Sequence, residues 1–170
     1  MKNLILAIAF SLSVLLGAAV FAPIFAQTQS TPSSPKEALM PNHATGPFEV
    51  KVTAQDDKID PQLGRFLLDK QYHGDLEATG KGQMLSAGNL AQGNGGYVAI
   101  EKVTGTLHGR AGSFILQHSG TMKDNVPQMS VILVPGSGTG RLEGIAGTMK
   151  INIAAGGKHT YDFEYTLPAD

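Results

Sequence analysis

Apolar and polar residues alternate with a period of two through most of the chain after residue 46. The alternation is regular over residues 97–104, where Tyr97, Ala99 and Val103 share one face with Glu101. Side chains of a β-strand point to opposite faces in turn, so this period indicates strands with one buried face. The pattern therefore predicts half-buried β-strands, and no amphipathic helix is expected in this part of the chain.

Short runs rich in glycine, proline and asparagine separate the alternating segments and predict turns. The predicted strands cover residues 47–53, 65–73, 75–87, 97–104, 113–122, 128–134, 141–145, 148–154 and 161–166. Short strands at such regular spacing are typical of an all-β sandwich or closed barrel. Because the turns join consecutive strands, we expect a small closed antiparallel barrel of about eight to nine strands, similar to a lipocalin. The interior of such a barrel is filled by side chains or holds one small ligand.

Residues 97–122 predict a central β-hairpin with Gly109 in its turn. If the turn is centred between Gly109 and Arg110, Glu101 lies opposite His118 on the apolar face. Opposed residues in an antiparallel pair have Cβ atoms about 4.5–5.5 Å apart, so the carboxylate and the imidazole can hydrogen-bond. A turn displaced by one residue is expected to separate the two side chains.

The Glu101–His118 pair has two interpretations. An acid and an imidazole on an apolar face are a candidate functional site, because burial and mutual charge perturb their pKa values. In that interpretation Tyr97 forms an aromatic wall of the site. The alternative is an ordinary cross-strand ion pair or a satisfied polar group in the core, since structural ion pairs perturb pKa values as well.

Lys70 and Tyr72 complete the set of candidate ligand-binding residues, because both fall on the predicted inner face of their strand. A buried ammonium group without a partner costs several kcal/mol, so Lys70 requires a partner or a route to solvent. Glu101 is the candidate partner. The tyrosines of the predicted barrel, including Tyr161 and Tyr165, are expected to pack in the core with their hydroxyl groups hydrogen-bonded near a barrel end.

The 170-residue chain predicts one folded domain preceded by an export segment. Residues 1–26 contain an early lysine, a long uncharged apolar run and a final alanine, as in a secretory signal peptide cleaved after Ala26. The apolar run is longer than the usual signal core, so an uncleaved membrane anchor is the alternative. Residues 27–46, rich in Pro, Ser and Thr, predict a disordered linker, and residues 47–168 predict the barrel. We therefore expect a periplasmic or secreted protein.

Charge and composition exclude several classes of function. The whole chain has 13 basic and 14 acidic residues, and removal of residues 1–26 deletes only Lys2, which leaves 12 basic residues and a formal charge of −2. Such a balance gives no electrostatic basis for binding nucleic acid. The absence of cysteine excludes disulfides, thiolate metal sites and lipid attachment through cysteine. The histidines show no metal-binding spacing, so no metal or cofactor is expected. The sequence does not specify an oligomeric state.

Four runs of residues resemble the bacterial domain-of-unknown-function family 3224. They are residues 68–77 (LDKQYHGDLE), 96–105 (GYVAIEKVTG), 112–121 (GSFILQHSGT) and 135–142 (PGSGTGRL). The resemblance extends over about residues 46–168, and it implies the small β-barrel of allene oxide cyclases and dirigent proteins. It implies no function, and no catalytic residue of the plant cyclases has a matching motif here. The export segment departs from most members of the family, which carry no signal.

Three functions are compatible with this sequence. The first is a binding module, in which the barrel holds a small apolar or aromatic molecule whose polar end contacts Glu101 and His118. The second is an enzyme of the isomerase or cyclase type, in which one of these two groups moves a proton. The third is a solid barrel with a structural or interaction role. A membrane is an expected partner only if the N-terminal segment stays uncleaved.

Overall fold

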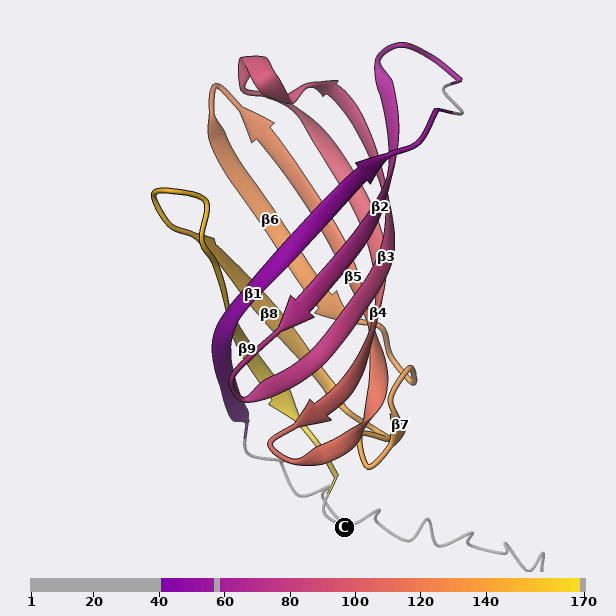
Figure 1. Ribbon diagram of the computed structural model, residues 1–170, viewed down its shortest axis with the longest axis vertical. Coiled ribbons are helices and arrows are strands. Elements are labelled where there is room, and N and C mark those ends of the chain that lie inside the picture. The colour runs from indigo at the N-terminus through magenta and orange to yellow at the C-terminus, as the bar shows by residue number, and fades with distance from the viewer. Residues whose placement is uncertain (1–40, 57–58, 169–170) are drawn as a thin grey trace, which may run out of the picture. The chain divides into compact units, whose positions relative to one another are not determined.

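The computed structural model describes residues 41–56 and 59–168, and within them eight antiparallel strands close into a barrel (Figure 1). The closed barrel is the fold that the alternation predicts. The barrel strands are β1 (Asn42–Ala54), β2 (Leu63–Tyr72), β3 (Leu76–Asn89), β4 (Asn94–Leu107), β5 (Arg110–Lys123), β6 (Val126–Leu133), β8 (Ala146–Ile153) and β9 (His159–Thr166). A 3-10 turn, η1 (Leu90–Gln92), and a two-residue strand, β7 (Thr139–Gly140), complete the described elements.

The strands follow one another around the barrel as an antiparallel meander. Each of β1 to β5 pairs with the next strand along the chain, and β1 also pairs with β9, which closes the barrel. The joint between β6 and β8 is narrow, with Ile132 paired to Thr148. The short β7 lies beside Gly112 and Ser113 of β5. Closure through β1 and β9 brings the two ends of the barrel domain together.

The β4–β5 hairpin turns at His108 and Gly109, one residue earlier than the sequence predicts. Both residues have positive φ, 45° and 75°, as two-residue hairpin turns of this type require. Glu101 is therefore paired with Leu116, and His118 with Ala99, so the predicted direct opposition of Glu101 and His118 is wrong. Moving the centre of the turn by one residue changes the register by two, and both side chains stay on the same face. The expectation that such a displacement would separate them is wrong for this reason.

Residues 141–145 form a turn rather than the predicted strand. Leu142 and Ile145 are buried there, and the N–H of Ile145 donates to the carbonyl of Leu142. The apolar residues are spaced by three, which suits a tight turn that covers the end of a barrel. Gly144 has a φ of 77°, a conformation that glycine adopts without strain.

The barrel begins before the predicted boundary at Pro47. Residues 42–46 belong to β1 and pair with β9, from Asn42 opposite Tyr165 to Gly46 opposite Tyr161. The predicted signal segment, residues 1–26, and the predicted linker up to residue 40 lie outside the described residues. Within residues 41–56 and 59–168, no helix has the length and apolar character needed to span a membrane.

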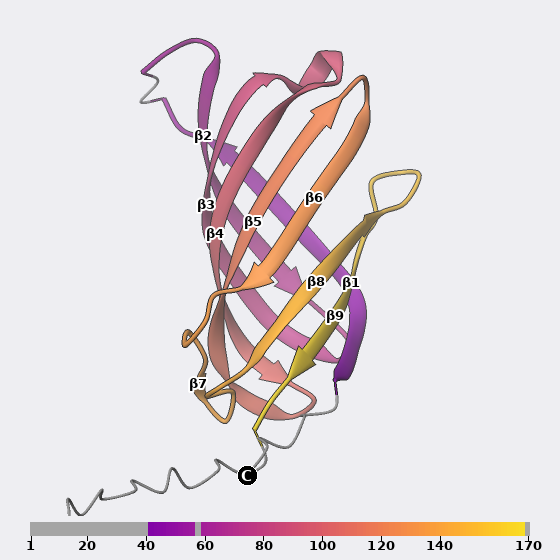
Figure 2. The same cartoon turned by 180° about the vertical axis from the view of Figure 1, so that it is seen from behind.

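The two ends of the barrel differ. At the closed end, which carries the turns 73–75 and 108–109 and the segment 134–145, buried side chains fill the interior. At the open end, which carries the connection from β1 to β2 and the turns 90–93 and 124–125, the barrel wall is incomplete. The β8–β9 hairpin stops short of this end (Figure 2), because β9 pairs with β1 over Asn42–Phe48 and β8 pairs with β6 at Ile132.

Candidate functional site

Four polar side chains meet inside the barrel, and we call them the polar cluster: Lys70, Tyr72, Glu101 and His118. The ammonium of Lys70 lies 2.7 Å from Glu101 Oε2, and the hydroxyl of Tyr72 donates to Glu101 Oε1 at 2.8 Å. Lys70 Nζ also donates to the Tyr72 hydroxyl at 3.2 Å. Glu101 is 0 % exposed and Lys70 is 6 % exposed. The sequence-based expectation that Lys70 has Glu101 as its partner agrees with this geometry.

Two glycines of β3 make the cluster possible. Lys70 and Tyr72 belong to β2 and Glu101 belongs to β4, so β3 lies between them. A Cβ atom at Gly80 would collide with Glu101 Oε1, and one at Gly82 would lie within 3.2 Å of Glu101 Cα and Cβ. Side chains at these positions would block the path across the inner face of β3. The two glycines suggest bends or bulges where a sheet curls, and the register of β3 with both neighbours runs through Gly80 and Gly82 without a bulge.

The cluster keeps Glu101 ionised. Burial alone would raise the pKa of Glu101, but the nearby imidazole of His118 and the ammonium of Lys70 together lower it below its ordinary value. Burial raises the pKa of Tyr72 well above its ordinary value, and the Glu101 carboxylate adds to the effect. Tyr72 therefore stays a neutral hydrogen-bond donor. Lys70 Nζ also lies 5.0 Å from the ring centre of Phe48, a distance at which an aromatic face attracts a cation.

His118 is the least satisfied member of the cluster. Its Nε2 lies 3.1 Å from Glu101 Oε2, yet the atom is buried and has no hydrogen-bond partner in the described structure. The contact is close enough for charge interaction, but it lacks the alignment of a hydrogen bond. His118 is paired with Ala99 on β4, between the levels of Tyr97 and Glu101. Its imidazole therefore lies on the open-end side of the carboxylate.

The structure brings four of the five candidate residues together and leaves the fifth apart. Tyr97 shares the inner face, but it lies four positions before Glu101 on β4, a separation of roughly 13 Å along a strand. Its ring packs where a side chain at Gly120 would stand. Tyr97 therefore belongs to the open end and not to the polar cluster. His118 lies nearer the open end than Glu101, and both side chains are buried.

The family model described as "Protein of unknown function (DUF3224)" matches residues 44–165. The chain belongs to the DUF3224 family. A solved structure of a DUF3224 protein of unknown function from Shewanella oneidensis MR-1 is 43 % identical, with a TM-score of 0.71. The alignment covers 77 % of this chain and 100 % of that chain. A comparison with curated proteins gave no match. The family membership supports the barrel and supplies no activity.

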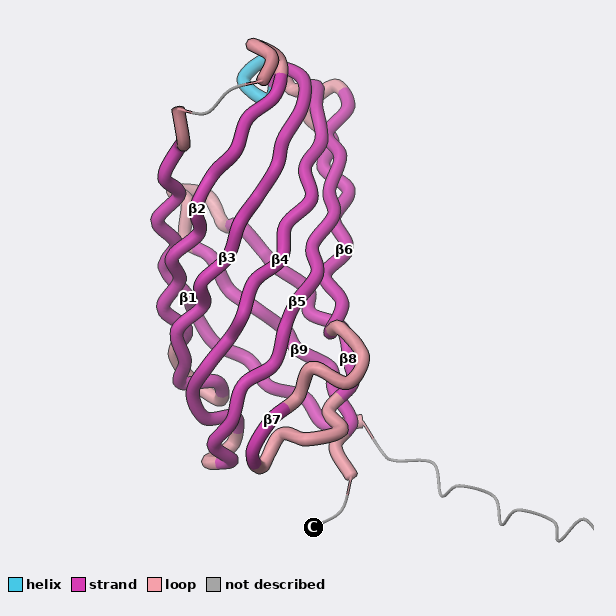
Figure 3. Tube along the Cα trace, turned by 90° about the vertical axis from the view of Figure 1, so that its right-hand side faces the viewer, coloured by secondary structure: helices cyan, strands magenta, loops and turns pink. Residues whose placement is uncertain are grey.

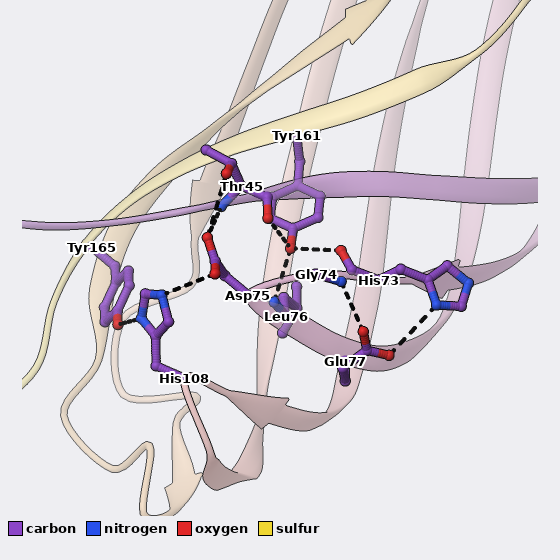
Figure 4. Close-up of polar contacts among 9 residues, drawn as sticks. All are labelled: Thr45, His73, Gly74, Asp75, Leu76, Glu77, His108, Tyr161 and Tyr165. Atoms are coloured by element: carbon purple, nitrogen blue, oxygen red, sulfur yellow. Dashed lines mark hydrogen bonds and ion pairs between the residues drawn. The ribbon is translucent and has the colours of Figure 1, made fainter.

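The closed end of the DUF3224 barrel carries a second group of polar contacts (Figure 4). Asp75 accepts a hydrogen bond from the backbone N–H of Thr45 at 2.8 Å and lies 3.5 Å from His108 Nε2. The other ring nitrogen of His108 is 2.7 Å from the hydroxyl of Tyr165. The bond from Thr45 lowers the pKa of Asp75 below its ordinary value. These contacts tie two turns to β1 and β9, so we interpret them as structural.

Tyr161 anchors the same end of the barrel. Its hydroxyl accepts a hydrogen bond from the N–H of Leu76 at 2.8 Å and lies 3.0 Å from the carbonyls of both Thr45 and His73 (Figure 4). A hydroxyl has one proton, so it donates to one carbonyl at a time. The prediction that the tyrosines Tyr161 and Tyr165 pack in the core with bonded hydroxyl groups near a barrel end is confirmed.

The contacts of Asp75 and His108 were not predicted from the sequence. The two residues lie in different turns, and strand alternation relates only residues within paired strands. The one local signal in the sequence is the glycine directly before Asp75, because glycine is favoured in tight turns. In the structure this residue, Gly74, has a φ of 96°. In the described part of the chain, no group of three or more His, Asp or Glu side chains is arranged to hold a metal ion.

Proposed function

We propose that this DUF3224 barrel binds a small apolar or aromatic molecule inside its open end, with the polar group of the molecule next to His118. The observation that carries the proposal is a set of inward-facing apolar side chains that remain accessible above the imidazole of His118. Val52 and Met129 share the inner face with buried neighbours, yet they are 48 % and 42 % exposed. Exposed apolar surface inside a barrel is a favourable site for an apolar ligand.

The walls of the proposed site come from β1 to β6. Phe66, Met84 and Tyr97 also face inward at the open end, and each is only partly buried. Methionine side chains adapt to ligands of different shape because they are unbranched and polarizable. Aromatic rings add flat contact area. The shape of a ligand that fits these walls is therefore set by flexible and aromatic groups rather than by charge.

The floor of the proposed site is His118. Its Nε2 lies 3.1 Å from Glu101 Oε2 without an aligned hydrogen bond, so a ligand hydroxyl next to Nε2 would complete the hydrogen bonding of the imidazole. Lys70 and Tyr72 act behind this floor by holding Glu101 in place. The enclosure of Glu101 and its contacts with Lys70 and Tyr72 support a structural role for this carboxylate.

The test uses protein purified from its own host and examined by native mass spectrometry. We expect an additional mass that is released on denaturation. Met129→Asp places a charge among the apolar walls and should abolish retention of the molecule. Val126→Asp is the matched control, because Val126 lies on the same strand, is exposed and faces outward. The proposal would be refuted if protein from the host has the mass of the polypeptide alone, or if both variants retain the molecule equally.

We also propose that the protein is exported. The support is the composition of residues 1–26, with one charge, a long apolar run and a final alanine. The mass and N-terminal sequence of the protein from its host test this proposal. A mature chain that begins at Gln27 and is recovered outside the cytoplasm is the expected result. A full-length chain in the cytoplasm would contradict export, and a full-length chain in the membrane would indicate an anchor.

A further inference from the structure

We propose that the last part of β1 is a strand edge to which an extended peptide of a partner protein adds as an extra strand. The pairing of β1 with β9 ends with Phe48 opposite His159, whereas β1 continues to Ala54. On its other side, β1 stays paired with β2 as far as Ala54 opposite Phe66. Residues 49–54, which we call the free edge, therefore have β2 as their only strand neighbour among the described residues.

The backbone groups of the free edge alternate in direction. In antiparallel strands, residues that bond to one neighbour alternate with residues whose N–H and C=O groups point the other way. The N–H of Gln55 donates to the carbonyl of Arg65 on β2, so the odd-numbered residues of the free edge bond to β2. The N–H and C=O groups of Val50, Val52 and Ala54 therefore point away from β2, with the spacing and direction that an incoming strand needs.

The opposite side of the opening is less suited to pairing. β6 extends nearer to the open end than β8 does (Figure 3), and the register of these two strands is limited to Ile132 and Thr148. The N–H of Val134 donates to the carbonyl of Ile115 on β5, so the odd-numbered residues of β6, including Pro127, face the opening. Proline has no N–H to donate and protects an exposed strand edge. The free edge of β1 contains no proline.

The opening has room for an added strand. Near the closed end, β9 and β8 lie between β1 and β6. Three inter-strand steps of ~4.8 Å then separate β1 from β6, a distance of about 14 Å. Nearer the open end, no described strand occupies this width, because the β8–β9 hairpin ends before it (Figure 1). A peptide strand beside β1 takes the place that a longer β9 would occupy.

The side chains of the free edge define the peptide that fits it. Val50 and Val52 face the interior, and Val52 is 48 % exposed. Peptide residues opposite these two must be apolar, so that they cover the valines. Glu49, Lys51 and Thr53 face outward, and a basic, an acidic and a neutral residue are their complements in a paired strand. Read from its N-terminus, an antiparallel peptide is therefore apolar, neutral, apolar, acidic, apolar and basic.

Recognition of this kind uses the backbone and the side chains for different purposes. The main-chain hydrogen bonds of an added strand supply affinity, and its alternate side chains supply specificity. The added strand would also complete the barrel wall at the open end. The inference goes beyond the binding of a small molecule and does not depend on it, because it rests on the backbone groups of β1 and not on His118.

Fluorescence anisotropy of a labelled hexapeptide, Val-Thr-Val-Glu-Val-Lys, with the barrel lacking residues 1–40 is the first test. The barrel can be studied alone, because the alignment with the Shewanella structure covers that entire chain. We expect saturable binding. N-methylation of the second valine, which lies opposite Val52, keeps every side chain and should weaken binding about tenfold, as expected for one lost hydrogen bond. Equal binding of the two peptides, or no binding of either, would overturn the proposal.

A peptide with its glutamate and lysine exchanged tests the order of residues along the free edge. The exchange places lysine opposite Lys51 and glutamate opposite Glu49, and like charges directly opposite each other destabilise a strand pair. We expect weaker binding at low salt. Equal affinity of the two peptides would contradict the proposed register.

A proline substitution tests which strand accepts the peptide. Val52→Pro removes an N–H that points into the opening, and it should weaken binding of the hexapeptide by about tenfold or more. Met129→Pro is the matched control, because the N–H of Met129 points into the opening from β6. Thermal melting confirms that both variants are folded. Loss of binding in Met129→Pro with full binding in Val52→Pro would overturn the assignment to β1.

Hydrogen exchange of the wild-type barrel needs no substitution. At a peptide concentration of about ten times its Kd, exchange at Val50, Val52 and Ala54 should slow about tenfold. Exchange at Lys51 and Thr53, whose N–H groups already bond to β2, should not change. Slow exchange at the first three residues without peptide, in a dimeric barrel, would show that a second copy covers the edge. Slow exchange that requires residues 27–40 would show that the chain covers its own edge, and either result would overturn the proposal.

Discussion

Lys70 and Glu101 form a 2.7 Å ion pair although a whole strand, β3, separates the strands that carry them. The pair crosses the inner face of β3 at Gly80 and Gly82, where no side chain stands in the way. Tyr72 and His118 approach the same carboxylate from either side. The barrel thus contains a charged centre that depends on the absence of side chains at two positions.

Glu101→Gln should destabilise the barrel by about 3–5 kcal/mol, because it leaves the ammonium of Lys70 buried without its counter-charge. Chemical denaturation at neutral pH measures the loss. The double variant Lys70→Met/Glu101→Met removes both charges and should recover much of the stability, since apolar replacement of a buried pair is often neutral. If Glu101→Gln unfolds at the same denaturant concentration as the wild type, the pair contributes nothing to stability.

The stability of the barrel should fall in acid partly through Glu101. The pKa of Glu101 in the folded barrel lies below its ordinary value of 4.5, so the unfolded chain takes up the proton first. The stabilisation is therefore fully present above pH about 4.5 and is lost as the pH falls through the folded-state pKa. Thermal unfolding from neutral pH downward should show a shallower decline for Glu101→Gln than for the wild type. Parallel declines would show that Glu101 does not control this range.

Gly80→Ala should destabilise the barrel by roughly 1–3 kcal/mol, as expected when a methyl group is forced into a packed interior. The added Cβ collides with Glu101 Oε1 and lies 3.2 Å from the Tyr72 ring. Gly96→Ala is the matched control on β4, because the nearest atom to its Cβ would be the carbonyl oxygen of Gly120 at 3.3 Å. Thermal melts of the two variants compare them directly. Equal melting temperatures would mean that the space over β3 is not required.

Tyr161→Phe should cost about 1–3 kcal/mol, because the buried N–H of Leu76 loses its acceptor. Tyr165→Phe removes the contact with the partly exposed His108, and should cost less. Hydrogen exchange at Leu76, together with denaturant unfolding, measures the difference. An unchanged exchange rate at Leu76 in Tyr161→Phe would contradict the anchoring role of the hydroxyl.

The alternation of side chains predicts the barrel because it depends only on local geometry. It also predicts that Glu101 and His118 share the inner face, and this holds in spite of the incorrect register, since a shift of two residues preserves the face. The same rule fails at residues 141–145. Two apolar residues spaced by three, Leu142 and Ile145, are buried there by a turn that no strand pattern describes.

Other features could not be predicted because they depend on several strands at once. The bond from Tyr72 to Glu101 requires knowing that β3 carries glycine on the path between them. The contact between Asp75 and His108 joins two turns whose spacing is set by the curvature of the closed barrel. The pairing of the exposed residues Leu85 and Val98 becomes visible only when the outward positions of adjacent strands are aligned by their register.

The junction of β1 with β9 has a consequence for the order of folding. The other principal pairings join neighbours in sequence, whereas this junction unites residues such as His43 and Asp162, which are 119 positions apart. The entropy lost on closing so long a loop is compensated only when the two strands that pair are already formed. Such distant pairings slow folding. We therefore expect the hairpins to form early and the pairing of β1 with β9 to form last. The barrel of a nascent chain then stays open until its final strand has been synthesised.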